Sequence, residues 1–352
     1  MNKYLMKIGA ILRQSNFLKI NRFLALMLLV MPGMVWAGGG SKKDGEEQFD
    51  PSEMINHHIS DSHVWEIYHG LTVYLPVIVY SEEKGLDIFS SANFYDHEEV
   101  VPYNGYIMDH DHITLENGGN VFDISITKNV LFLFIDAIIL ILVFSAVARG
   151  YKKNAGKAPK GIQSFFEPII VFIRDDIAKD NIGKKYEKFM PYLLTVFFFI
   201  WFGNLLGLLP GAANLTGNIS VTLVLALLTL FFTLFSGRKT YWLHIVDPLG
   251  KSMPWLGKIF MYLILWPVEI IGIFTKPFSL MIRLFANITA GHILILSIIS
   301  LAFVFQSLSV GVVGALFATV MNMLELFVAV LQAYVFTLLS ALYFGQAVEE
   351  HH

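Results

Sequence analysis

The chain has 352 residues, of which 55% are hydrophobic and only 15% are charged. Soluble domains average roughly 45–50% apolar and about 25% charged residues, so this composition predicts a protein that crosses a membrane several times. The formal net charge of −3 decides little, and the absence of cysteine excludes disulfides, thiolate catalysis and cysteine-bound zinc or iron–sulfur centres.

Residues 1–37 are typical of a secretory signal peptide. Basic residues precede the apolar run FLALMLLVMPGMVWA, and the small residues Val35 and Ala37 form the expected cleavage site. The run is shorter than the ~20 residues that a spanning helix needs. An uncleaved first anchor is the alternative, and on either interpretation we expect the residues after Ala37 to lie on the outer side of the membrane.

Residues 38–122 are polar and acidic, with short runs such as LTVYLPVIVY that are typical of strands. We expect a small periplasmic extension, partly strand and partly disordered. Two clusters offer metal-ligand types: NHHISDSH, which holds His57, His58, Asp61 and His63, and DHDH at 109–112. A solvated acidic segment is the preferred interpretation of both clusters, and no metal site is predicted.

Residues 123–352 form the predicted membrane domain. The run at 129–148 ends in a basic cluster, which the positive-inside rule places in the cytoplasm. The amphipathic stretch 161–180 predicts a helix at the membrane interface. Residues 190–210 and 218–237 are expected to cross outward and back inward.

Residues 259–302 and 311–348 are apolar over about twice the ~20 residues needed to cross, which predicts strongly tilted helices. The expected fold is therefore all-α and polytopic, with five crossings and a cytoplasmic C-terminus. The sequence shows no internal repeat. PLGKS at 248–252 resembles part of a phosphate-binding loop, but Ile245 stands where that loop needs glycine, so no nucleotide site is predicted.

Ionisable side chains inside a membrane are costly and mark functional sites. The last two apolar segments carry Glu269, Lys276, Arg283, His292 and Glu325. Glu325 and Gln332 are seven residues apart, so they share one helix face.

The polar residues of 259–302 divide between two sides of one helix. Ser279, Arg283 and Asn287 recur every four residues and share a face. His292 follows Arg283 by nine residues, which places it on the opposite side and about 13 Å further along the axis. The helix thus offers a cation on one side and a titratable imidazole on the other.

This pattern suits proton movement. A His–Glu pair can pass protons near neutral pH. Arginine stays protonated, so Arg283 acts as a fixed charge. At about 4 Å and an effective dielectric near 20, that charge attracts a carboxylate by roughly 4 kcal/mol, enough to make an approaching acid release its proton.

The alternatives are structural. They are Arg283 as an anchor paired with Glu269 or Glu325, His292 as a core histidine, Lys276 as a side chain reaching the inner interface, and Glu269 as a solvated helix end.

Three stretches resemble the signature of subunit a of the F-type ATP synthase: KPFSLMIRLFANITAGH, PYLLTVFFFIWFGNLLGLLPG and LQAYVFTLLSALYFGQAVEEH. The similarity covers roughly residues 129–352. It implies a stator channel subunit with two offset half-channels, which carry protons to and from the carboxylates of a rotating ring of c subunits.

By this resemblance, Arg283 corresponds to the essential arginine that faces the ring, and Asn287 to the asparagine one turn on. Gln332 corresponds to the glutamine that faces the arginine from the last helix. Glu269 matches an acidic position near the inner access path, to which Ser279 is also assigned.

His292 and Glu325 match a pair that some members carry in the reverse order. The swap keeps the chemistry of the pair and leaves the order of proton transfer within it open.

The resemblance also implies the partners. They are the c-subunit ring, the b-subunit peripheral stalk, the remaining ATP synthase subunits and the lipid bilayer of a bacterial inner membrane. No cofactor, nucleotide or nucleic acid is expected on this chain, and ATP would be made elsewhere in the complex. The alternatives are a stand-alone proton-coupled transporter or channel, and a membrane anchor for an assembly.

Overall fold

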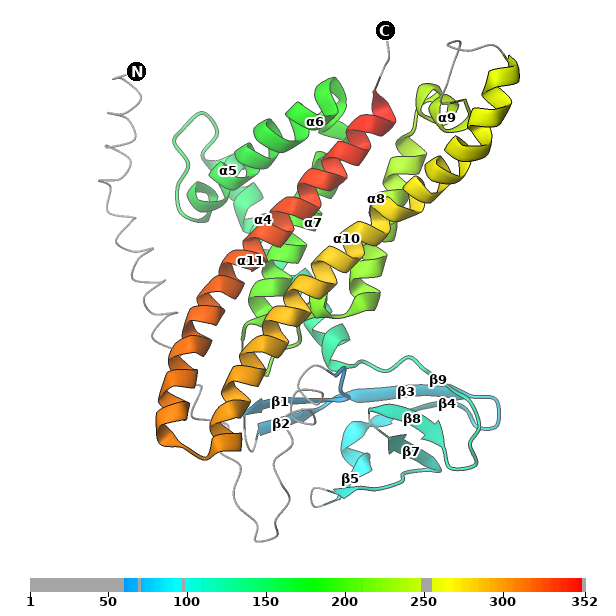
Figure 1. Ribbon diagram of the computed structural model, residues 1–352. Coiled ribbons are helices and arrows are strands. Elements are labelled where there is room, and N and C mark those ends of the chain that lie inside the picture. The colour runs from blue at the N-terminus through cyan, green and yellow to red at the C-terminus, as the bar shows by residue number, and fades with distance from the viewer. Residues whose placement is uncertain are drawn as a thin grey trace.

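The computed structural model describes residues 60–68, 71–96, 99–109, 111–209, 211–247 and 255–349. A small β unit, residues 60–126, lies at one end of a helical bundle, and the C-terminus lies at the other end (Figure 1). The predicted signal peptide, His57 and His58, and the PLGKS stretch fall outside the described residues.

The β unit consists of short antiparallel pairings. The strands are β1 (Val64–Tyr68), β2 (Leu71–Tyr74), β3 (Pro76–Ser81), β4 (Gly85–Ser90), β5 (Tyr95–Asp96), β6 (Glu99–Val100), β7 (Tyr106–Asp109), β8 (His112–Leu115) and β9 (Val121–Asp123). Strand β3 lies between β4 and β9, while β1–β2, β5–β6 and β7–β8 are two-stranded. Because strand side chains alternate, Val77 and Val79 on β3 face a core that Phe94 and Tyr106 complete.

The N-terminus of the first helix, α4 (Lys128–Lys153), is bound to the β unit. The Asp61 carboxylate accepts hydrogen bonds from the Thr127 hydroxyl and the Asn129 amide, both at 3.0 Å. A negative group is favourable there because the first amides of a helix have no internal partner. Trp65 meets the ring of Phe132 edge-on at 5.2 Å, which adds an apolar contact.

Two members of the acidic clusters are therefore structural, and the expectation of a solvated segment is wrong for them. His63 is only 2% exposed, and its Nε2 lies 3.2 Å from the Asp123 carboxylate. Burial opposes ionisation of Asp123, but hydrogen bonds from His63 and Ser125 outweigh it, so the pKa of Asp123 is lowered. Among the described residues, no three acidic or histidine side chains come together as a metal site.

Within the described residues, the bundle holds five apolar helical stretches long enough to cross a membrane, as expected. Its helices are α4, α5 (Ile162–Phe172), α6 (Asp180–Ile182), α7 (Tyr186–Gly207), α8 (Ile219–Ser236), α9 (Lys239–Val246), α10 (Trp255–Phe305) and α11 (Leu308–Val348). A π-helical stretch, Ile173–Lys179, joins α5 to α6. The 161–180 segment buries Ile173 and Ile177 in the main core, in keeping with its amphipathic sequence, and its place at the membrane interface stays a prediction.

Helices α10 and α11 are the longest elements, with 51 and 41 residues. At ~1.5 Å per residue they measure about 77 and 62 Å, which is roughly two and a half times and twice the ~30 Å hydrocarbon core of a bilayer. They run side by side in opposite directions, joined by a turn in which Gln306 has a φ of 45° (Figure 1).

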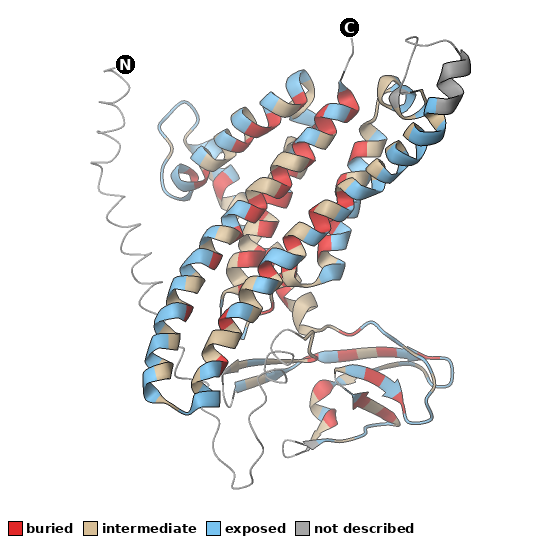
Figure 2. Cartoon of the chain, in the orientation of Figure 1, coloured by how far each residue is buried: buried red, intermediate tan, exposed pale blue. Residues whose placement is uncertain are grey.

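The C-terminal half of α11 is the most enclosed part of the bundle (Figure 2). It packs against α7, α8 and α10 in one apolar cluster with Leu193 and Phe344 at its centre. Gly345 meets the backbone of Asn181 so closely that an added Cβ would overlap the Asn181 carbonyl oxygen. Only glycine fits there, and α11 is fixed against α6.

Candidate functional site

The seven predicted site residues lie on the two long helices. Helix α10 carries Glu269, Ser279, Arg283, Asn287 and His292, and α11 carries Glu325 and Gln332. The two α11 residues are each only 5% exposed and point into the bundle. The α10 residues are partly or fully exposed, so they lie along the border of its buried stripe.

Arg283 stands beside the packed stripe of α10. Its neighbours Leu280 and Leu284 are buried in the cluster that includes Phe336 of α11. Among the described residues, no ion pair joins Arg283 to an acidic side chain. Glu269 lies fourteen residues away on the same helix, about 21 Å along its axis, which is too far to neutralise it. The structure therefore gives no support to the interpretation of Arg283 as an internally paired anchor.

Glu325 reaches across to the turn of α10 that carries His292. Its Oε1 lies 3.5 Å from the position that a Cβ on Gly291 would take, so the glycine lets the carboxyl approach the α10 backbone. Gly291 directly precedes His292. Among the described residues, Glu325 Oε2 has no hydrogen-bond partner. The structure thus places the Glu325 carboxyl against the turn of α10 that includes His292.

Further polar residues continue from Glu325 into the bundle. Asn204 of α7 is buried; its amide donates to the carbonyl of Ala329 at 3.4 Å, and its side-chain oxygen accepts from the Thr216 hydroxyl. Ala329 lies one turn after Glu325 on α11. These contacts connect α7 and the 211–217 loop to the α11 face that bears Glu325.

Asp136, in the middle of α4, is the residue that sequence reasoning missed. It is 0% exposed, and among the described residues neither of its oxygens has a hydrogen-bond partner. Its Oδ2 lies 3.9 Å from the position that a Cβ on Gly203 would take, and Gly203 precedes Asn204. A buried carboxyl without a partner is costly, which points to a role beyond packing. The lone acid in NVLFLFIDAIILIL was the available signal. We call Asp136, Asn204, Thr216, Glu325 and Gln332 the buried polar row.

A polar cavity of about 270 Å³ opens at the other end of the two long helices, near the C-terminus. Glu269, Lys276, Gln346 and Glu349 contribute the charged and polar groups of its wall. Lys276 Nζ donates to Gln346 Oε1 at 2.9 Å, which holds the ammonium at the wall. Burial raises the pKa of Tyr241, and the nearby Glu269 charge raises it further, so this phenol stays protonated.

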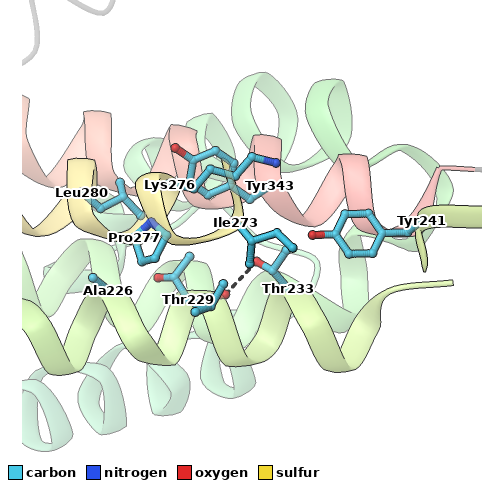
Figure 3. A pocket seen from close by; sticks show the side chains of 10 residues that line it. Ala226, Thr229, Thr233, Tyr241, Ile273, Lys276, Pro277, Leu280 and Tyr343 are labelled. Atoms are coloured by element: carbon cyan, nitrogen blue, oxygen red, sulfur yellow. Dashed lines mark hydrogen bonds between the residues drawn. The ribbon is translucent and has the colours of Figure 1, made fainter. Parts of the chain in front are cut away.

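A second, smaller void of about 10 Å³ adjoins the polar cavity, and Figure 3 shows the side chains that line this void. Tyr241 and Lys276 line both spaces, and Thr229, Tyr343 and Leu280 line only the inner one. Its size is close to the ~10–15 Å³ that a single water requires. Leu280 lies three residues before Arg283, so the two spaces lead from the end of the bundle toward the arginine.

Comparison with known proteins now gives the family. Residues 130–345 match the family model described as ATP synthase A chain, and residues 54–131 match one described as a domain of unknown function, DUF8433. The chain is 48% identical over 258 residues to ATP synthase subunit a 2 of Chlorobaculum tepidum, covering 69% of this chain and 71% of that protein.

Two further relatives agree. ATP synthase subunit a of Chloroherpeton thalassium is 48% identical over 242 residues, which is 67% of this chain and 71% of that protein. The subunit a of an Anaeromyxobacter species is 37% identical over 308 residues, covering 85% of this chain and 71% of the relative. Its described part holds five apolar helices, so this chain is a multi-pass membrane protein, and it belongs to the ATP synthase subunit a family.

Proposed function

We propose that this chain is the stator channel subunit of a rotary ATP synthase. It conducts protons through two offset half-channels, to and from the carboxylates of a ring of c subunits, and so couples proton flow to rotation of the ring. The observation that carries the proposal is the position of Arg283, between the polar cavity on one side and the buried polar row on the other. Family membership supports the same function.

The polar cavity forms the inner half-channel. Water entering past Glu269 and Lys276 reaches the small void at Leu280, close to Arg283. Ser279 lies on the same side of α10 as Arg283 and belongs to this path. A ring carboxylate that arrives opposite Arg283 gives its proton to this water, because the fixed positive charge stabilises the ionised acid.

The outer half-channel contains His292 and the buried polar row. A proton passes through the His292–Glu325 pair to the next ring carboxylate, and Gln332 and Asn287 border the place of transfer. Asp136 and Asn204 extend this path toward the end of the bundle that bears the β unit. Imidazole suits the task because it binds and releases protons near neutral pH, and a carboxyl group beside it can accept a proton and pass it on.

Arg283 separates the two half-channels. A guanidinium remains protonated, so it relays no protons and repels any that would cross directly between the two paths. Each proton that falls through ~100 mV releases about 2.3 kcal/mol, which the separation preserves for rotation.

In this function the chain has one orientation in the membrane and a defined set of partner subunits. The β unit lies in the periplasm and the C-terminus in the cytoplasm of a bacterial inner membrane. The c-ring lies beside α10 and α11, the b-subunit stalk holds this chain still, and other subunits of the complex make the ATP. Family membership favours this role over a stand-alone transporter, which needs no ring.

The test is proton pumping by the assembled complex in sealed vesicles, driven by ATP and followed with a pH-sensitive dye. Arg283→Ala abolishes pumping, and Arg283→Lys restores little because lysine lacks the planar fork. Arg149→Ala is the matched control: Arg149 is exposed, and its Nε donates within its own helix, to Ser145 O at 3.2 Å. Normal pumping by Arg283→Ala, with the c-ring still co-purifying, would reject the mechanism.

A further inference from the structure

One face of the β4–β3–β9 sheet is apolar, and no described residue covers it. Side chains alternate along these strands, so the face opposite the β-unit core carries Ile78, Tyr80, Leu86, Ile88, Phe122 and Ile124, which we call the apolar sheet face. Ile88 is 66% exposed and Phe122 is 68% exposed. Contiguous apolar patches of this kind mark interaction sites.

The residues of the apolar sheet face adjoin one another across the strands. Ile78 stands opposite Ile88, and Tyr80 stands between Leu86 on β4 and Phe122 on β9. The pairs are antiparallel, so these side chains form one continuous surface.

Charged residues of these strands point to the other face. Asp87 of β4 accepts a hydrogen bond from the Tyr106 hydroxyl at 2.7 Å, and Asp123 of β9 lies 3.2 Å from His63. The described residues of the apolar sheet face therefore include no charge.

The sheet is joined directly to the start of a membrane-crossing helix. Ile124 and Ile126 continue the pairing with β3, because their backbone N–H groups donate hydrogen bonds to the carbonyls of Ile78 and Pro76, at 2.9 and 3.1 Å. Helix α4 begins two residues later, at Lys128. The sheet thus lies at the level where the chain enters the membrane.

The apolar sheet face is turned toward the level of the helices. In Figure 1, the sheet lies between the level of the bundle and the β7–β8 hairpin, and it extends sideways past the helices. Met108 and Ile113 of that hairpin pack on the core face of the sheet, so the opposite face points away from the hairpin.

We propose that the apolar sheet face rests on the lipid surface of the leaflet at which α4 begins. Exposed apolar residues of α4, such as Phe134 and Ile138, face lipid along a crossing helix, and the sheet continues that apolar surface sideways. Tyrosine and phenylalanine at its centre suit the boundary between headgroups and acyl chains. The contact is apolar, so it does not depend on anionic lipid.

Spin-label accessibility tests the proposal in the complete ATP synthase complex, reconstituted in phosphatidylcholine nanodiscs. The chain has no cysteine, so Ile88→Cys, Phe122→Cys and Thr114→Cys each give it a single nitroxide site. Thr114 is exposed on β8, on the opposite side of the β unit, and is the matched control. Wild-type complex treated identically supplies the background from other subunits.

We expect the labels at positions 88 and 122 to collide more with oxygen, which concentrates in lipid, than with a water-soluble nickel chelate. The label at position 114 shows the reverse. Replacing a third of the lipid with phosphatidylglycerol leaves these ratios unchanged.

Three outcomes would overturn the proposal. Nickel accessibility at 88 and 122 equal to that at 114 would place the face in water. Shielding from both reagents would assign it to a protein: another subunit, a second copy, or residues 1–59 of this chain. A lipid preference seen only with phosphatidylglycerol would assign the attraction to charge.

Discussion

The two sides of Arg283 differ in how they are exposed to water. Toward the C-terminus, Glu269 and Lys276 line a cavity of about 270 Å³, large enough for several waters. Toward the β unit, Glu325 and Asp136 are 5% and 0% exposed. Water can replace a side chain in a wet path, but in an enclosed path each proton-binding group is needed. Substitutions should therefore be much more harmful in the buried polar row than in the polar cavity.

The largest expected effect, and therefore the strongest test of this difference between the two sides, comes from removing the carboxyl group of Glu325. Glu325→Gln should lower ATP-driven proton pumping about 10²-fold, because it removes a group that binds and releases the proton in transit. Glu325→Asp keeps the acid and should retain more activity than Gln. The measurement is the initial rate of vesicle acidification at matched ATP hydrolysis. Equal rates for the Gln variant and the wild type would mean that water bypasses this residue.

Asp136 gives a second test on the enclosed side. Asp136→Asn keeps the shape and should slow pumping about tenfold, since an amide does not transfer protons. Asp136→Leu should slow it at least as much while raising stability by about 1–3 kcal/mol, because a buried carboxyl without a partner is removed. Thermal unfolding of the complex gives the second quantity. Slower pumping together with lower stability in both variants would indicate damage to the fold and not to a proton path.

On the open side, single polar substitutions should have small effects. Glu269→Gln and Lys276→Met should each pump within about threefold of the wild type, because water can take over the lost contact. Gly272 lines the cavity. Among the described residues, a Cβ added there would come near only Glu269 Oε2, at 3.9 Å. The side chain of Gly272→Phe therefore has room to fill the cavity. We expect Gly272→Phe to slow pumping more than either polar substitution. The reverse ranking would show that the side chains, and not the water, carry the protons.

The smallest expected effect concerns the β unit. The pKa of Asp123 is lowered in the folded protein, so its contribution is present above the unfolded value of about 3.9 and is lost as pH falls through the folded value. Asp123→Asn should cost about 1 kcal/mol at pH 7 and nothing at pH values well below 3. Hydrogen exchange of β9 and the first turn of α4 measures this. A cost independent of pH would show that the ionised form of Asp123 is not the source of this stability.

The membrane helices could be predicted from the sequence, because each contains an apolar run of sufficient length with few polar residues. Each crossing helix contains a long apolar run that the sequence shows directly. The predicted stretch 129–148 lies within α4, and the predicted stretch 218–237 nearly coincides with α8. Helical spacing likewise placed Glu325 and Gln332 on one buried face. Information of this kind is local, since it depends on residues within a few turns of one another.

What the sequence left open depends on contacts between distant segments. The polar cavity needs Tyr241, Lys276 and Gln346 from three helices, and no local pattern brings them together. The roles of Asp61 and His63 were misread for the same reason. Their partners, Asn129 and Asp123, lie 68 and 60 residues away along the chain.

The contact between Gly345 and Asn181 has a mechanical consequence. In the proposed function, a turning ring pushes sideways on the helices that face it, and its torque is useful only if those helices do not yield. Side chains are compressible because they can change rotamer, whereas Gly345 brings α11 directly against the α6 backbone. A force on α11 is thus transmitted through this backbone contact to the rest of the subunit, with little displacement of α11.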